Sequence, residues 1–221
     1  MKKILLFLMF VTILSSIYAQ DTIALALKVK GRVNLNRSDS NEKLELGDSL
    51  IDRDEIVSKD DSFAAVRFVD GSAIVKLFSN SRLAINADKK TEKYDKKSYL
   101  KMGTLWTKVT TNSGGFDVET PTTVVSVRGT EFIVEVDEKG ITRVYAVSGK
   151  VSVKNKKTGQ EVVLVEGQST QDDNNNPMQV GDIDWDEVPG EADDEVVTPQ
   201  VLQLELENAE GERRAVEIKF E

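Results

Sequence analysis

Short runs in which apolar and polar residues alternate dominate the chain between residues 22 and 170. The stretch Phe63–Phe78 is one example, because it holds two such runs around Asp70-Gly71, a dipeptide typical of tight hairpin turns. The other predicted strands lie at 23–35, 44–50, 100–110, 116–119, 122–127, 131–136, 141–147, 151–153 and 162–165. Residues 89–101 are ambiguous, and no stretch shows a convincing helical period. The pattern predicts an all-β protein, a two-layered β-sandwich/roll of short, mostly antiparallel strands.

Glycine interrupts several of these runs. Gly129, within Arg128-Gly129-Thr130, divides two valine-rich runs, where glycine usually marks a bulge, a bend or a close backbone approach. We favour this structural interpretation over a role for Arg128 in presenting a cation to an anionic ligand. Gly71 and Gly149 are expected in hairpin turns.

Some segments also resemble one another. "VKGRVNLN" at Val29 is similar to "VSGKVSVKN" at Val147, and "FVDGSAIVKL" at Phe68 is similar to "SVRGTEFIVEV" at Ser126. A structural repeat and convergence on the same turn chemistry explain this equally well.

The order of the motifs resembles the FecR family domain over roughly residues 22–170. The resemblance is carried by Gly47-Asp48, Asp70-Gly71-Ser72, Gly103, Phe116 to Pro121, Arg128 to Phe132 (with Gly129 and Thr130), Gly149 to Val151 and Gly167-Gln168. It implies an all-β domain of two layers of short strands. Regulators of that family place a sigma-factor-binding segment and a membrane helix before this domain, whereas an export signal is expected there in this chain. Because of this difference, the signalling role is not expected to carry over, and the chain resembles a free-standing exported FecR domain.

The N-terminus predicts export. Two lysines precede an apolar run from Ile4 to Leu14, and Ala19 offers a small residue for cleavage. Residues 1–19 are thus expected to be a cleaved signal peptide, with a retained anchor as the alternative, and no later segment is expected to span a membrane. The expected location is the periplasm or the outside of the cell.

Charge divides the remaining chain. Residues 20–167 hold 24 Lys and Arg against 22 Asp and Glu, whereas residues 168–199 hold ten acidic residues and no basic one. We expect a domain at 20–170 and an acidic linker at 171–199. Asp182, Asp184 and Asp186 alternate as calcium ligands can, but the turn glycine and terminal glutamate of an EF-hand loop are missing. The net charge of −9 argues against a nucleic-acid partner.

Residues 200–221 predict a β-hairpin with its turn around Gly211. Its apolar positions, which are candidates for docking on a partner, are Leu202, Leu204, Leu206, Val216, Ile218 and Phe220. An isolated hairpin is only marginally stable in water, so it should pair with a sheet edge of its own domain or of another protein.

Histidine and cysteine are absent, which removes histidine-based triads, cysteine nucleophiles and ordinary zinc sites. We expect neither an enzyme nor a cofactor. The weak candidates for ligand binding are Arg128 and two residues of the lysine-rich stretch 89–101, Lys93 and Lys97, although a solvated linker is the favoured interpretation of that stretch. The expected function is an exported binding or scaffolding module with an envelope protein partner. The alternative is a periplasmic sensor of a small anionic or carbohydrate ligand.

Overall fold

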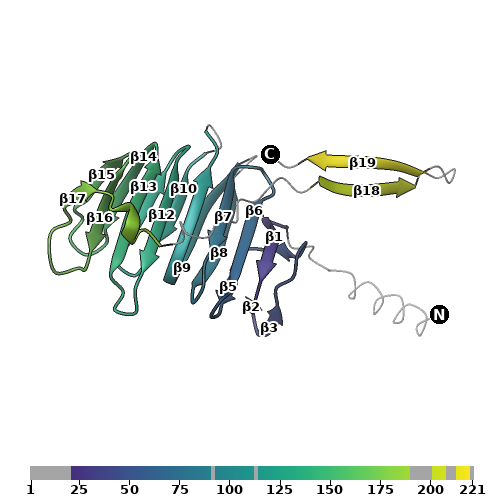
Figure 1. The fold of residues 1–221 in the computed structure, drawn as a ribbon, viewed down its shortest axis with the longest axis horizontal. Helices are drawn as coiled ribbons and strands as arrows, with labels where there is room; N and C mark the ends of the chain where they lie inside the picture. The colour runs from purple at the N-terminus through teal and green to yellow at the C-terminus, as the bar shows by residue number, and fades with distance from the viewer. Residues whose placement is uncertain (1–20, 91–92, 112–113, 190–200, 208–212, 220–221) are drawn as a thin grey trace, which may run out of the picture.

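The computed structural model describes residues 21–90, 93–111, 114–189, 201–207 and 213–219. The expected signal peptide, residues 190–199 of the expected linker, the expected hairpin turn around Gly211 and Phe220 lie outside these residues. Apart from one 3-10 turn, all regular elements in the described part of the chain are strands, as the alternating pattern predicts. Seventeen of the described strands form one hydrogen-bonded network. They lie side by side along the molecule, with β1 near one end and β17 at the other (Figure 1).

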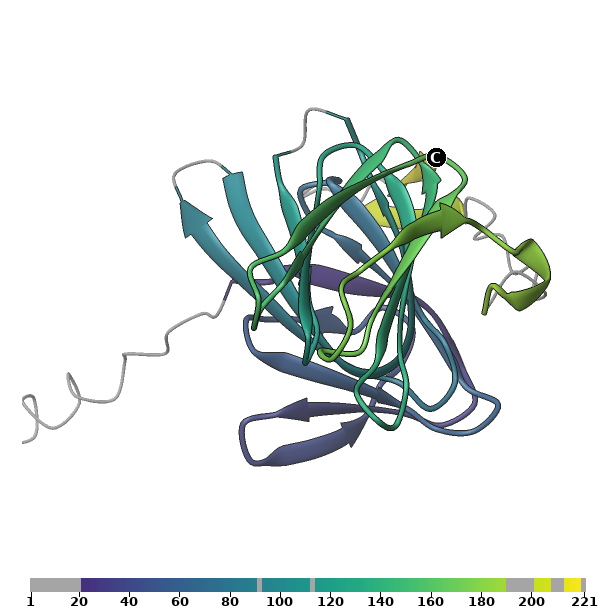
Figure 2. The same cartoon turned by 90° about the vertical axis from the view of Figure 1, so that its left-hand side faces the viewer.

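The network folds into two layers. Layer A has the order β4-β1-β6-β7-β9-β12-β13-β16-β17, and layer B has the order β3-β2-β5-β8-β9-β10-β11-β14-β15. All pairs are antiparallel except β9 with β10. Figure 2 looks at the roll from its β15–β17 end.

The strand bounds follow the predicted runs closely. Layer A comprises β1 (Ala24–Lys30), β4 (Ser49–Leu50), β6 (Phe63–Phe68), β7 (Ala73–Leu77), β12 (Glu131–Val136), β13 (Thr142–Ser148), β16 (Gln168–Asp172) and β17 (Val180–Asp182). Layer B comprises β2 (Val33–Arg37), β3 (Ser40–Lys43), β5 (Asp54–Ser58), β8 (Arg82–Lys90), β10 (Phe116–Glu119), β11 (Thr123–Val127), β14 (Lys150–Asn155) and β15 (Glu161–Val165). Strand β9 (Lys93–Val109) belongs to both. The ambiguous stretch 89–101 is therefore strand, in β8 and β9.

Strand β9 joins the layers at Gly103. Up to Met102 it pairs with β8 in layer B, and from Gly103 onward it pairs with β12 in layer A. Gly103 has φ +95°, and a Cβ there would lie 2.5 Å from Ser81 Cα. Both the backbone conformation and the available space therefore require glycine at this crossing.

Gly129 interrupts a good strand pattern because the chain passes there from one layer to the other. It connects β11 of layer B with β12 of layer A, at φ +71°, and a Cβ there would lie 2.9 Å from Thr111 Cα. Gly149 is likewise a crossing, from β13 to β14, and not the hairpin turn that its sequence suggested. The cause is that the two flanking strands do not pair with each other. Strand β13 pairs with β12 and β16 in layer A, whereas β14 pairs with β11 and β15 in layer B.

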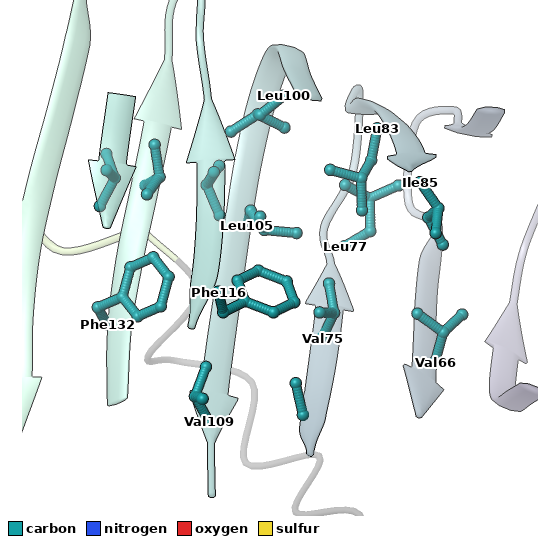
Figure 3. Packing of buried hydrophobic residues seen from close by; sticks show 14 of the residues in the cluster. Val66, Val75, Leu77, Leu83, Ile85, Leu100, Leu105, Val109, Phe116 and Phe132 are labelled. Carbon is teal, nitrogen blue, oxygen red and sulfur yellow. The ribbon is translucent and has the colours of Figure 1, made fainter. Parts of the chain in front are cut away.

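The core lies between the layers. Buried side chains from both layers form one continuous cluster that includes Phe68, Phe116 and Phe132. Figure 3 shows part of this cluster, with Phe116 and Phe132 labelled. The rings of Phe68 and Phe116 pack edge to face with centroids 5.5 Å apart, joining β6 to β10 across the interior. This cluster supplies the stability that a chain without disulfides needs.

The structure differs from the expected acidic linker at residues 171–189. Strand β17 pairs with β16, and a 3-10 turn at Trp185–Glu187 follows. Ile183 and Val188 pack against Ile133 and Tyr145 on the outer face of layer A, with Trp106 and Val147 beside them. Burial of these apolar side chains fixes a segment whose composition alone suggested disorder. Asp184 caps the turn by accepting from the Asp186 N–H, and no carboxylate group suited to a metal ion is found in the described residues.

The C-terminal hairpin is confirmed. Strands β18 (Val201–Glu207) and β19 (Arg213–Lys219) pair in register, with Leu202 opposite Ile218 and Leu204 opposite Val216. They form a two-stranded sheet of their own. Among the residues that the structure describes, no helix is long and apolar enough to cross a membrane.

Candidate binding groove on the outer face of layer B

The outward-facing residues of β9, β10, β11, β14 and β15 line up across layer B. Register places Lys97 beside Asp117, Asp117 beside Ser126, Ser126 beside Ser152, and Ser152 beside Val163. A groove of about 670 Å³ lies along this face. We call it the layer B groove, and its walls include Lys97, Asp117, Arg128, Lys150, Lys154 and Glu161.

Local strand geometry explains why these side chains share one face. Val151 and Val153 of β14 are buried in the core, so the alternating residues Lys150, Ser152 and Lys154 must point away from it. Arg128 follows the last residue of β11 and is exposed. The parallel pairing of β9 with β10 brings Lys97 to the same face.

The groove is locally cationic on an acidic protein. Within the described part of the chain, no carboxylate is within ion-pair distance of Arg128, Lys97, Lys150 or Lys154, and only Asp117 and Glu161 are acidic residues of the lining. The Glu161 carboxylate accepts from Ser152 Oγ at 2.7 Å. The four cations are therefore available to a ligand, and their closeness makes the groove attractive to an anionic one.

Two of the three ligand-binding residues suggested by the sequence line the layer B groove. Arg128 and Lys97 line the same groove although they are 31 positions apart. Lys93 is the first residue of β9, and its side chain lies outside the described part of the structure. Lys150 and Lys154 were missed, although the alternation in "KVSVK" could have placed them on one exposed face.

Lys96 is not part of a solvated cluster. It is 2% exposed, and its Nζ lies 2.8 Å from Asp70 Oδ2 in the turn between β6 and β7. Burial by itself would raise the pKa of Asp70, but hydrogen bonds from Lys96 and Ser72 outweigh it and hold that pKa below its usual value. This ion pair joins a turn of layer A to a strand of layer B.

The remaining motif residues shape the fold. Gly47 has φ +88° in the turn before β4, and Gly167 has φ +80° at the passage from β15 to β16. Pro121 is exposed in the β10–β11 turn. Thr130 is buried and donates to the Lys150 carbonyl at 3.1 Å, and Phe132 is fully buried in the core. Asp70, Gly71 and Gly103 occupy the turn and the crossing described above.

A second groove, of about 750 Å³, lies on the outer face of layer A. Its aromatic residue is already engaged, because Lys76 Nζ lies 4.3 Å from the Trp106 ring centroid and Trp106 Nε1 donates to Glu131. Glu131 also pairs with Lys108 at 3.3 Å. These four polar and aromatic side chains already bind one another, so the layer B groove is the better candidate for a ligand site.

Comparison with known proteins agrees with this architecture. The family of FecR proteins matches residues 54–152, and no curated protein matches the chain. Two crystal structures of a putative anti-sigma factor from Parabacteroides distasonis ATCC 8503, at 1.65 and 2.50 Å resolution, each match with a TM-score of 0.50 and 18% identity. Each match covers 58% of this chain and 59% of the other, so the likeness is one of fold over part of each protein.

The matched segment runs from β5 into β14 and includes the crossings at Gly103 and Gly129, while the same roll continues beyond it on both sides. FecR domains are typically non-catalytic and regulatory. Residues 54–152 of this chain are a FecR domain.

Proposed function

We propose that this chain is an exported, non-enzymatic binding module of the cell envelope that acts through protein–protein contacts. The layer B groove would take an extended, acidic segment of a partner protein. The observation that carries the proposal is the convergence of four cations, Arg128, Lys97, Lys150 and Lys154, on one outer sheet face. None of them pairs with a carboxylate of the residues that the structure describes.

The shape of the groove favours an extended segment. Its lining comes from five adjacent strands and lies on the outside of the sheet, whereas small molecules usually bind in deeper concave sites that cover most of their surface. Apolar contact is offered by Val124 and Val163 between the charged positions. A segment that alternates acidic and apolar residues would match both features.

A photo-crosslinking residue at Ser152, in the middle of the groove, tests the proposal in living cells. We expect it to capture one defined envelope protein, and the double variant K150E/K154E to abolish that capture. The same crosslinker at Gln171, which is exposed on β16, is the matched control and should not capture that protein. Equal capture from both positions, or capture that survives the charge reversal, would refute the groove as the site.

A second candidate is a sensor of a small anionic or carbohydrate ligand, favoured by the hydroxyls of Ser126 and Ser152 beside the cations. A ligand that binds only the native state raises the unfolding temperature. Thermal unfolding with phosphate, citrate or galacturonate at millimolar concentration would show such a rise, and the rise should vanish in K150E/K154E. No rise with any of the three argues for the protein partner.

A further inference from the structure

The last strand of layer B, β15, is an open sheet edge of unusual composition. Four strands end the layers in the described part of the chain, and each pairs on one side only. Three of these edges are protected, since β4 has two residues, β17 has three, and the sequence of β3 is the fully exposed Ser-Asn-Glu-Lys. Strand β15 has the sequence Glu-Val-Val-Leu-Val instead. A longer, apolar edge of this kind is what natural proteins usually avoid unless something pairs with it.

The backbone of β15 has unpaired groups on its outer side. The Asn155 N–H donates to the Gln160 carbonyl, and antiparallel alternation then directs Val162 and Leu164 toward β14. Glu161 and Val163 therefore direct their N–H and C=O groups toward the free edge. The Val165 N–H, which points the same way, is capped by Gln168 Oε1 at 3.1 Å. The edge can thus accept hydrogen bonds from an added strand along Glu161–Val163.

Apolar surface lies on both sides of this edge. Val163 and Val165 are 55% and 44% exposed on the outer face, and Leu164 is buried in the core. Met178 closes the core at this end and is held by Gln160, which accepts from the Met178 N–H and donates to its carbonyl, both at 2.9 Å. An added strand would therefore find apolar neighbours above and below the sheet.

The C-terminal hairpin has matching chemistry. In β18 the apolar residues Leu202, Leu204 and Leu206 alternate with Gln203, Glu205 and Glu207. If β18 paired with β15, its three leucines could extend the core beside Leu164. The acidic set would then lie on the outer face, next but one to Lys150 and Lys154 of β14.

The hairpin also needs a partner. Its strands pair only with each other in the described residues, and two-stranded sheets are marginally stable in water. Figure 1 shows the hairpin beyond the β1 end of the stack, whereas β15 lies at the opposite end. We propose that the hairpin of one copy pairs with the β15 edge of a second copy, by strand addition. Reciprocal pairing gives a closed dimer and one-way pairing gives a chain, and both raise the mass above that of a monomer.

Engineered disulfides test the pairing directly, because the chain has no cysteine. Two single variants of the chain from Gln20, V163C and Q203C, are mixed under mild oxidation, and the V163C–Q203C heterodimer is quantified. The control mixes Q203C with V180C, whose position on the β17 edge is exposed to a similar degree. We expect at least tenfold more heterodimer with V163C. Equal yields would overturn the proposal, as would a V163C/Q203C chain that closes its disulfide within a monomer at high dilution.

A proline on the free edge gives an independent measurement. The Val163 N–H points away from β14, so V163P removes the donor for an added strand and keeps the β14–β15 pairing. By sedimentation velocity, we expect the chain from Gln20 to associate at high micromolar concentration. V163P and a chain ending at Pro199 should both remain monomeric. Their thermal midpoints of unfolding should match that of the native chain from Gln20. The same mass for all three proteins would overturn the proposal.

Discussion

The Nζ of Lys96 lies 2.8 Å from Asp70 Oδ2, in a pair that ties β9 to the turn between β6 and β7. The Lys96 side chain is 1% exposed and that of Asp70 is 24% exposed. An ammonium group that is buried so deeply requires an opposite charge nearby. The pair therefore explains how a lysine can occupy an interior position between the layers.

Removing the carboxylate from this pair should destabilise the protein. Breaking a buried ion pair at one partner costs about 3–5 kcal/mol, and the partial exposure of Asp70 reduces this to about 1–3 kcal/mol for Asp70→Ala. Urea unfolding measures the change. The control is Asp117→Ala on the outer face, which should change the free energy of unfolding by less than about 0.5 kcal/mol. Equal effects of the two substitutions would show that the pair contributes nothing.

The same pair predicts a pH dependence of stability. The pKa of Asp70 is lower in the folded protein than its usual value, so its contribution is fully present above the unfolded pKa of about 3.9. That contribution is lost as the pH falls through the lower, folded pKa. Thermal midpoints between pH 7 and pH 2.5 should fall more steeply for the native protein than for Asp70→Asn. Parallel curves would contradict the assignment.

Gly103→Ala should destabilise the crossing of β9 between the layers. The substitution combines left-handed strain of about 1–2 kcal/mol with overpacking against Ser81, which costs about 1–3 kcal/mol. Gly47→Ala is a matched control, because Gly47 also has positive φ but has no atom within 4 Å of an added Cβ. Urea unfolding should therefore show a clearly larger loss for Gly103→Ala. A similar loss at both positions would mean that close packing at Ser81 is unimportant.

The docked segment at residues 183–188 should control the ionisation of Tyr145. Burial raises the pKa of the Tyr145 phenol, and the charge of Glu135 raises it further. Ending the chain after Asp182 removes Ile183 and Val188 from this phenol, so the pKa should move back toward 10. An ultraviolet titration, with Tyr145→Phe as the reference for the signal, measures the shift. An unchanged pKa would show that this segment does not shield the phenol.

Periodicity predicted the strands well because each inward valine or leucine faces one common core. It missed Lys96, since a charged side chain on an inward position breaks the pattern that identifies such positions. It also missed the docking of residues 171–189, where the buried apolar residues Met178, Ile183 and Val188 are too sparse to form a period.

The groove was only half predictable. Arg128 and Lys97 were named separately, and the parallel pairing of β9 with β10 that brings them to one face is a long-range contact that no local pattern encodes. Lys150 and Lys154 could have been placed on a shared exposed face by alternation alone. Their position beside Arg128 depends on the pairing of β11 with β14, across an intervening hairpin in the other layer.

The most direct test of the proposed function is the affinity of the layer B groove for an acidic strand. Fluorescence anisotropy would follow a labelled peptide of alternating glutamate and valine binding to the chain from Gln20. We expect saturable binding that weakens with added salt, falls at least tenfold in K150E/K154E, and is unchanged in K139E, a variant of an exposed lysine in the β12–β13 turn. Equal binding by all three proteins, or no binding by the native chain, would contradict the proposal.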